Sequence, residues 1–246
     1  MASDVRSFIH RYLHLSQRVY SSGAWLLLIA FASQTLLAGD SKDSDLEASI
    51  DALQSKYLHV RDLKMEFIQS YRSSRRPMKT ETGILFLKRP GMMRWEYETP
   101  KKKLFISNGK NVYFYLPDER QVQKTKVKES RDQRVPFLFL LGKGNLKKDF
   151  SRVEWAEDSQ PFYQGNRIIC AYPKKNIDEF AKILMEFNPQ TYQLQRVTVH
   201  DVDGSTSEFV FTNIHENVGI NSEQFDFKIP AGTEVQDYPG DDRASE

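Results

Sequence analysis

The chain has 246 residues, one cysteine and a formal net charge of +2 at pH 7. The length allows one large β domain or two small ones, and a single cysteine excludes an internal disulfide. Residues 1–38 hold three of the 35 basic residues and one of the 33 acidic residues, so the rest of the chain is neutral. A neutral domain lacks the basic surface that non-specific nucleic-acid binding requires.

Residues 1–38 have the layout of a signal peptide. Three arginines precede an apolar stretch at 24–32, and small residues follow near Ala38. The stretch is shorter than the roughly 20 apolar residues of a transmembrane helix. We therefore predict a targeting segment at 1–38 that is cleaved, followed by a single domain at 39–246. A retained N-terminal anchor is the alternative.

The first predicted element of the domain is an amphipathic helix. Ser44 and Glu47 form a capping-box pattern, which predicts a helix that starts near Ser44. Apolar residues then recur at helical spacing and predict one buried face, made of Leu46, Ile50, Leu53 and Tyr57.

After this helix the apolar period changes to two, which predicts strands. The first three lie at 63–71, 83–88 and 93–98. Asn108-Gly109 predicts a two-residue hairpin in which both residues take positive φ. Later strands are predicted near 151–157, 162–172, 179–187, 192–200, 205–215 and 225–229. So many strands without intervening helices predict one large antiparallel sheet.

One continuous apolar run, residues 135–141, interrupts the strand pattern between charged flanks. Pro136 suits the first turn of a helix, and Gly142 suits its end. A short helix that is apolar all round must be covered by protein or must cover an apolar surface. The residues therefore leave two interpretations open: a helix that plugs one end of the core, or a lid over a hydrophobic cavity.

No catalytic or metal-binding pattern stands out in the sequence. His59, His200 and His215 are not at metal-ligand spacings, and the HExxH, GxSxG and phosphate-loop motifs are missing. Cys170 lies in an apolar run and is expected to be a buried, unreactive residue. We expect no cofactor, and an enzyme is the weaker hypothesis, although a site assembled across the fold stays open.

A family resemblance is carried by residues 87–122, which combine Lys88-Arg89-Pro90, Trp95, an Asn-Gly turn and an aromatic strand. Together with 63–69, 135–138 and 225–235, these motifs resemble the LolA family of outer-membrane lipoprotein carriers over roughly 44–238. The resemblance implies a mainly β (α+β) fold. It would be a large antiparallel sheet curled into an incompletely closed β-barrel, with an N-terminal helix and short lid helices.

The resemblance also implies a function. The protein would be a monomeric periplasmic chaperone that takes acylated lipoproteins from an inner-membrane ABC transporter and delivers them to an outer-membrane acceptor. A hydrophobic cavity would shield the acyl chains, because each exposed methylene group costs about 0.8 kcal/mol in water. A carrier of another lipid or glycolipid, an envelope-stress sensor and a periplasmic enzyme are the alternatives.

The same resemblance also implies roles for individual residues. Arg89 matches the arginine that bonds the lid and helps gate the cavity, and a solvent-facing residue before the turn Pro90-Gly91 is the alternative. Phe67 and Trp95 match inward-facing cavity positions, and ordinary core packing is the alternative. Leu53 matches a helix position that faces the lid, again with ordinary core packing as the alternative. Met93 stands at the cavity mouth, where relatives often have phenylalanine in contact with the transporter. The lid face would consist of Phe137, Leu138, Phe139, Leu140 and Leu141.

Overall fold

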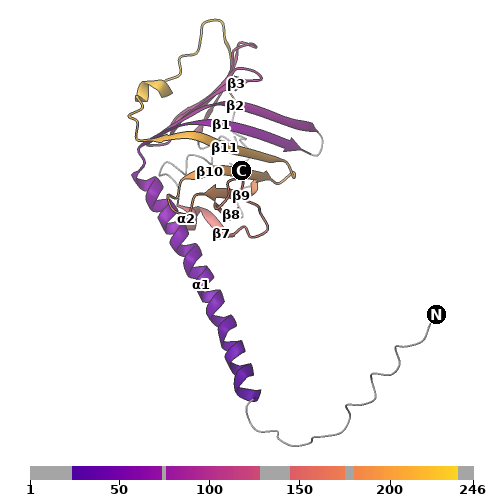
Figure 1. Ribbon diagram of the computed structural model, residues 1–246. Coiled ribbons are helices and arrows are strands. Elements are labelled where there is room, and N and C mark those ends of the chain that lie inside the picture. Colours follow the sequence, from indigo (N-terminus) through magenta and orange to yellow (C-terminus); the bar gives the residue numbers. More distant parts are fainter. Residues whose placement is uncertain (1–23, 74–75, 128–144, 175–179, 238–246) are drawn as a thin grey trace, which may run out of the picture. The chain divides into compact units, whose positions relative to one another are not determined.

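The computed structural model describes residues 24–73, 76–127, 145–174 and 180–237 (Figure 1). The chain divides into two compact units, Met1–Ser44 and Asp45–Glu246. The described part of the first unit, residues 24–44, is helical and belongs to α1 (Ala24–His59). Among the described residues, no helix has the length and apolar character needed to cross a bilayer.

Helix α1 continues through the position where the sequence predicted a start. The predicted N-terminus at Ser44 is wrong, since the residues before it are helical as well. Alanine and leucine are frequent there, and both are strong helix formers, so no chain break precedes the capping-box pattern. The predicted apolar face is confirmed, because Ile50, Leu53 and Tyr57 are buried.

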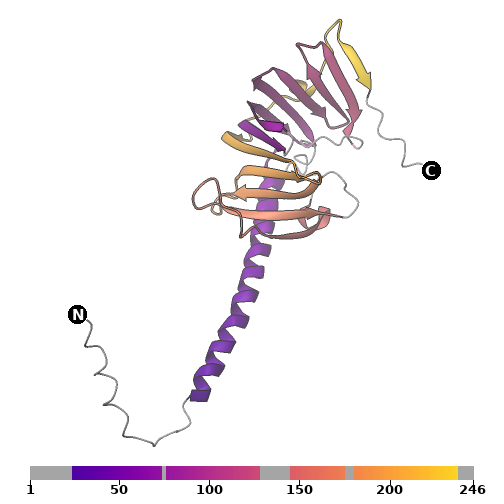
Figure 2. The same ribbon diagram turned by 90° about the vertical axis from the view of Figure 1, so that its right-hand side faces the viewer.

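The second unit is built on a 12-stranded sheet within the described residues, in the order β12-β6-β5-β4-β3-β2-β1-β11-β10-β9-β8-β7. The sheet does not close on itself. It twists along this order, with β12 (yellow) at one end (Figure 2). The first six strands are β1 (Asp62–Ser73), β2 (Arg76–Lys88), β3 (Met92–Thr99), β4 (Lys103–Asn108), β5 (Asn111–Leu116) and β6 (Gln121–Lys126).

The remaining elements are α2 (Leu146–Asp149), β7 (Phe150–Trp155), β8 (Arg167–Pro173), β9 (Phe180–Phe187), β10 (Leu194–Asp201), β11 (Thr206–Glu216), the 3₁₀ turn η3 (Ser222–Phe225) and β12 (Glu234–Asp237). The described strand pairs are antiparallel except β12 with β6, which is parallel. A mainly β fold with an unclosed sheet and an N-terminal helix confirms the predicted fold class. The predicted lid helix at 135–141 lies outside the described residues.

The turn at Asn108-Gly109 joins β4 to β5, which confirms the predicted hairpin. Only Gly109 has a positive φ, at 85°, so the predicted positive φ of Asn108 is wrong. The Asn108 side chain instead accepts hydrogen bonds from the backbone N–H groups of Lys110 and Asn111, at 3.0 and 2.9 Å. Such side-chain bonding stabilises a turn without a left-handed asparagine.

Two predicted strand segments are wrong. Residues 162–166 form a turn before β8, because the buried Glu186 carboxylate bonds the backbone N–H groups of Phe162 and Tyr163, both at 2.9 Å. Residues 225–229 form no strand: the fully buried Phe225 is the last residue of η3, which Asn221 caps, and residues 226–229 follow it without regular structure. The last strand lies later, at β12, where its partner β6 is distant in sequence and no local pattern indicates it.

The two faces of the sheet differ sharply. The face that carries Phe67, Trp95 and Phe209, here called the inner face, forms a single hydrophobic cluster with the apolar side of α1. The opposite face, which carries Lys64 and Phe86, is called the outer face. Because side chains alternate along each strand, the inner face collects most of the buried apolar residues of β1–β5 and β8–β11.

Candidate functional site

The inner face is centred on a group of packed aromatic rings. The Phe67 ring contacts Trp95 and Tyr97 edge-on, with both centroid distances at 4.9 Å. Trp95 in turn contacts Phe209 at 5.3 Å. These residues come from β1, β3 and β11, so their contact requires the central part of the sheet to be assembled. Edge-to-face contacts of this kind stabilise a packed group beyond the area they bury.

Gly83 provides the space that the Phe67 ring occupies. It is paired with Phe67 across β1 and with Tyr97 across β3. A Cβ atom at this position would lie 2.0 Å from the Glu96 carbonyl oxygen and 2.9 Å from Cζ of Phe67. The residue must therefore be glycine for two strands and one ring to approach this closely.

Helix α1 covers part of the inner face through Leu53 and Tyr57, which are 2 % and 7 % exposed. The Tyr57 hydroxyl accepts a hydrogen bond of 2.8 Å from the backbone N–H of Leu194, at the start of β10. Burial raises the pKa of Tyr57 above its ordinary value, so the phenol stays neutral. The end of the helix is thereby fixed against β10 by a polar contact as well as by packing.

Arg89 binds the C-terminal end of the same helix. Its Nε donates to the Val60 carbonyl at 2.7 Å, and its Nη2 donates to the Tyr57 carbonyl. The last carbonyls of a helix lack intrahelical partners and carry partial negative charge, so a guanidinium is well suited to them. The backbone N–H of Arg89 also donates to the Arg61 carbonyl at 3.0 Å. The contact that the sequence predicted between Arg89 and the lid involves residues outside the described ones.

Residues that follow the predicted lid are tied to α1. The backbone N–H of Leu146 donates to Oε1 of Gln54 at 2.8 Å, and the Leu146 side chain is buried. The Lys147 ammonium pairs with Asp51 at 2.7 Å and with Glu47 at 3.1 Å. Helix α1 therefore contacts Arg89 at its C-terminal end and, along its side, Leu146 and Lys147, the residues that follow the predicted lid. The predicted lid residues themselves, Phe137, Leu138, Phe139, Leu140 and Leu141, lie outside the described residues.

The structure brings four of the predicted site residues together. Leu53, Phe67, Met93 and Trp95 all belong to the one inner-face cluster and are buried. Met93 is 0 % exposed and is paired with Leu87 and Ser107, so in this conformation its side chain offers no surface to a partner. Sequence reasoning missed neighbours on the same strands that belong to the cluster, and the period-two alternation could have identified them: Leu85, Leu87, Tyr97, Phe105 and Phe209.

Charged groups lie at the edge of this cluster and are paired. Lys103 contacts Glu81 at 2.6 Å, and Lys79 contacts it at 2.7 Å. Burial alone would raise the pKa of Glu81, but the hydrogen bonds and charges of the two lysines outweigh it and lower the pKa. In the described part of the chain no three His, Cys, Asp or Glu side chains are grouped as metal ligands. Cys170 is buried, and burial raises the pKa of its thiol, as expected for an unreactive residue.

Comparison with known proteins gives one consistent family. The model of the family "Outer membrane lipoprotein carrier protein LolA" matches residues 59–228. An outer-membrane lipoprotein carrier protein of Nitrosospira multiformis is 28% identical over 213 residues, which cover 86% of this chain and 94% of the relative. A protein with the same description from Dechloromonas aromatica is 28% identical over 189 residues, or 76% of this chain and 86% of the relative.

Among solved structures, an uncharacterized conserved protein from Thermus thermophilus aligns with a TM-score of 0.50 at 8% sequence identity. The alignment covers 78% of this chain and 98% of the other. At such low identity the likeness concerns the fold alone. The family match is of a different kind, because it covers most of the chain and includes both the strands of the inner face and Arg89. The chain therefore belongs to the LolA family.

Proposed function

We propose that this protein carries acylated lipoproteins across the periplasm. It would accept them from an inner-membrane ABC transporter and release them to an outer-membrane acceptor. The observation that carries the proposal is the family match over residues 59–228, which spans an unclosed sheet with an apolar inner face. A carrier needs such a face because acyl chains are strongly disfavoured in water. We propose no catalytic step.

In this proposal the acyl chains bind against the inner face after part of its packing opens. The aromatic group around Phe67 and Trp95 is closed in the described conformation, with both rings fully buried. A sheet without a continuous hydrogen-bonded closure can widen at its ends without breaking a complete ring of strand pairs. Lipid binding would then replace ring–ring contacts by ring–acyl contacts of similar apolar character, which allows release as well as uptake.

Arg89 is proposed to control this opening through α1. Its guanidinium holds the Tyr57 and Val60 carbonyls, and the same helix binds Leu146 next to the predicted lid. A shift at the helix end would therefore be transmitted to the lid flank through a rigid element. Arginine suits this role because its planar fork can bond more than one carbonyl at once.

The cargo is tested by isolating the protein from its native periplasm and analysing bound molecules by mass spectrometry. We expect a lipoprotein with its acyl chains attached. A free glycolipid as the bound species would contradict the proposal. So would a protein isolated without bound lipoprotein, together with lipoprotein transport that stays intact in cells that lack the protein.

The role of Arg89 is tested with Arg89→Leu, using Arg61→Leu as the matched control. Arg61 lies at the same helix end, but its side chain is exposed. We expect Arg89→Leu to accept lipoprotein from membranes but to transfer it at least tenfold more slowly, because two charge-assisted bonds are lost. Arg61→Leu should behave as the wild type. Unchanged transfer by Arg89→Leu would remove this residue from the mechanism.

A further inference from the structure

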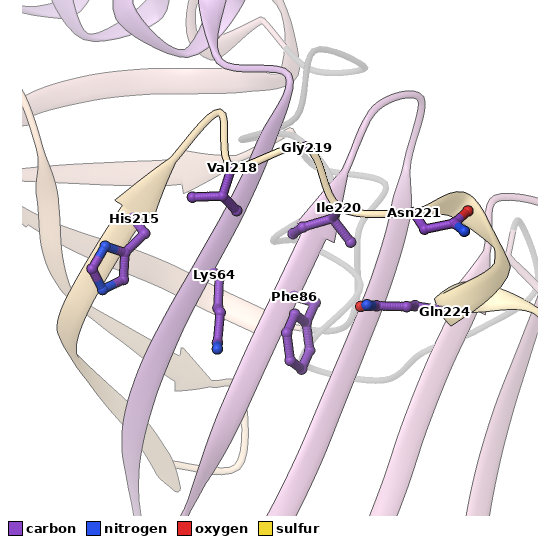
Figure 3. A pocket seen from close by; sticks show the side chains of 8 residues that line it. All are labelled: Lys64, Phe86, His215, Val218, Gly219, Ile220, Asn221 and Gln224. Atoms are coloured by element: carbon purple, nitrogen blue, oxygen red, sulfur yellow. The ribbon is translucent and has the colours of Figure 1, made fainter.

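A pocket of about 540 Å³ lies on the outer face, opposite the inner-face cluster. Pockets of roughly 300–1,000 Å³ are typical of small-molecule sites. Lys64 of β1, Phe86 of β2 and His215 of β11 point toward it, and the chain after β11 forms its rim (Figure 3). The rim residues are Val218, Gly219, Ile220, Asn221 and Gln224.

The rim of this pocket is held in place by hydrogen bonds to the sheet. The Gly219 N–H donates to the buried Asp62 carboxylate at 3.1 Å, and Asn217 N–H donates to the Asp62 carbonyl at 2.8 Å. Lys88 Nζ donates to the Ile220 carbonyl, and Arg94 Nη1 donates to the Gln224 carbonyl at 3.1 Å. The pocket is thus preformed, and a ligand would not have to order its walls.

The pocket combines an apolar lining with one cation. Phe86, Val218 and Ile220 supply the apolar surface, and Val218 remains 53% exposed. The Lys64 ammonium lies 5.8 Å from the centroid of the Phe86 ring and forms no ion pair within the described residues. An uncompensated ammonium beside apolar surface favours an anion that carries an apolar part.

The carboxylates around the pocket are engaged elsewhere. Glu66 accepts a bond from the Asn213 amide at 2.8 Å, and Glu216 pairs with Lys56 at 2.8 Å. The Asp62 carboxylate accepts the bond from the Gly219 N–H of the rim, as described above. None of the described residues that line the pocket carries a carboxylate, so the charged side chain that a ligand would meet there is Lys64.

We propose that this outer-face pocket is a second ligand site, for a small amphiphile with one anionic head group and a short apolar chain. The head group lies at Lys64, within reach of His215, and the chain lies between Phe86, Val218 and Ile220. The site is separate from the inner face, because Lys64 and Phe86 alternate with the inner-face residues of their strands. The inference does not depend on the proposed carrier function.

The site is tested with the full chain by nuclear magnetic resonance titration, following the Ile220 methyl groups and the His215 ring. Octanoate is the probe. Acetate supplies the head group alone, octyl glucoside supplies an uncharged head, and octylammonium supplies the opposite charge. We expect octanoate to shift both signals at lower concentration than any of the three comparison compounds. Equal shifts with acetate, octyl glucoside or octylammonium would overturn the proposal, and so would no shift with octanoate.

Two variants and two matched controls locate the binding. Lys64→Gln should weaken octanoate binding roughly threefold to tenfold, the range for a charge-assisted contact of an exposed lysine. Val218→Trp should fill the pocket and abolish the shifts. Lys110→Gln and Ile68→Trp change exposed residues outside the pocket and should leave binding unchanged. Octanoate binding at the inner face would shift the inner-face aromatic signals instead, so failure of this proposal is distinguishable from failure of the carrier function.

Discussion

Gly83→Ala is expected to destabilise the protein by about 2–4 kcal/mol, for reasons set by two distances. The new Cβ would lie 2.0 Å from the Glu96 carbonyl oxygen, which belongs to the backbone of β3 and cannot rotate away. Separating the two strands costs about one ladder hydrogen bond, or roughly 0.5–1.5 kcal/mol. Displacing the Phe67 ring, 2.9 Å from the new atom, adds an overpacking cost of about 1–3 kcal/mol.

Urea unfolding followed by circular dichroism measures this difference. The control is Gly165→Ala, where no atom lies within 4 Å but φ is 86°, so only backbone strain of about 1–2 kcal/mol is expected. Adding Phe67→Leu to Gly83→Ala should remove part of the overpacking cost against the ring. It should not remove the cost of the contact with the Glu96 carbonyl oxygen. A Gly83→Ala protein that is less destabilised than Gly165→Ala would refute the reasoning.

Two further predictions concern buried carboxylates. Glu81→Gln should reduce stability at neutral pH. The folded pKa of Glu81 is lowered from 4.5, so the stability that its carboxylate contributes is present above that value and is lost as pH falls through the folded pKa. The difference in unfolding free energy between Glu81→Gln and the wild type, measured in urea, should therefore shrink in acid. A difference that does not change with pH would contradict the prediction. Glu186→Ala should cost about 1–3 kcal/mol, because the N–H groups of Phe162 and Tyr163 lose their acceptor, while the Arg196 guanidinium loses a contact of 2.7 Å and keeps its weaker ion pair with Glu208 at 3.3 Å. Hydrogen exchange should also quicken at Phe162 and Tyr163, and unchanged exchange there would argue against the anchoring role.

The strand alternation made most of the fold predictable. Period-two patterns identified β1, β3 and the strands of the second half, since one face of each packs on α1 or on the other inner-face side chains. Strand β12 could not be found in this way. Its pairing is parallel to β6, far away in the sequence, and four residues are too few for a periodic signal.

The candidate site was predictable in part for similar reasons. The alternation of apolar and polar residues places Phe67 and Trp95 on the apolar face of their strands, whether they pack in the core or line a cavity. The bonds of Arg89 to the end of α1 could not be inferred, because they depend on where a helix ends in space. The outer-face pocket also escaped prediction, since it is formed by single residues from β1, β2 and β11 and by an irregular rim.

The strand order has a consequence for how the chain folds. Strands β1 to β6 form one meander of sequence neighbours, and β7 to β11 form another. A single seam joins them, β1 against β11, and its pairs, such as Phe67 with Phe211, bring together residues from opposite ends of the sheet-forming chain. Local meanders assemble faster than distant pairs, because loop closure costs more entropy for the latter. The aromatic group that spans the seam through Trp95 and Phe209 therefore forms last, and its packing reports completion of the fold.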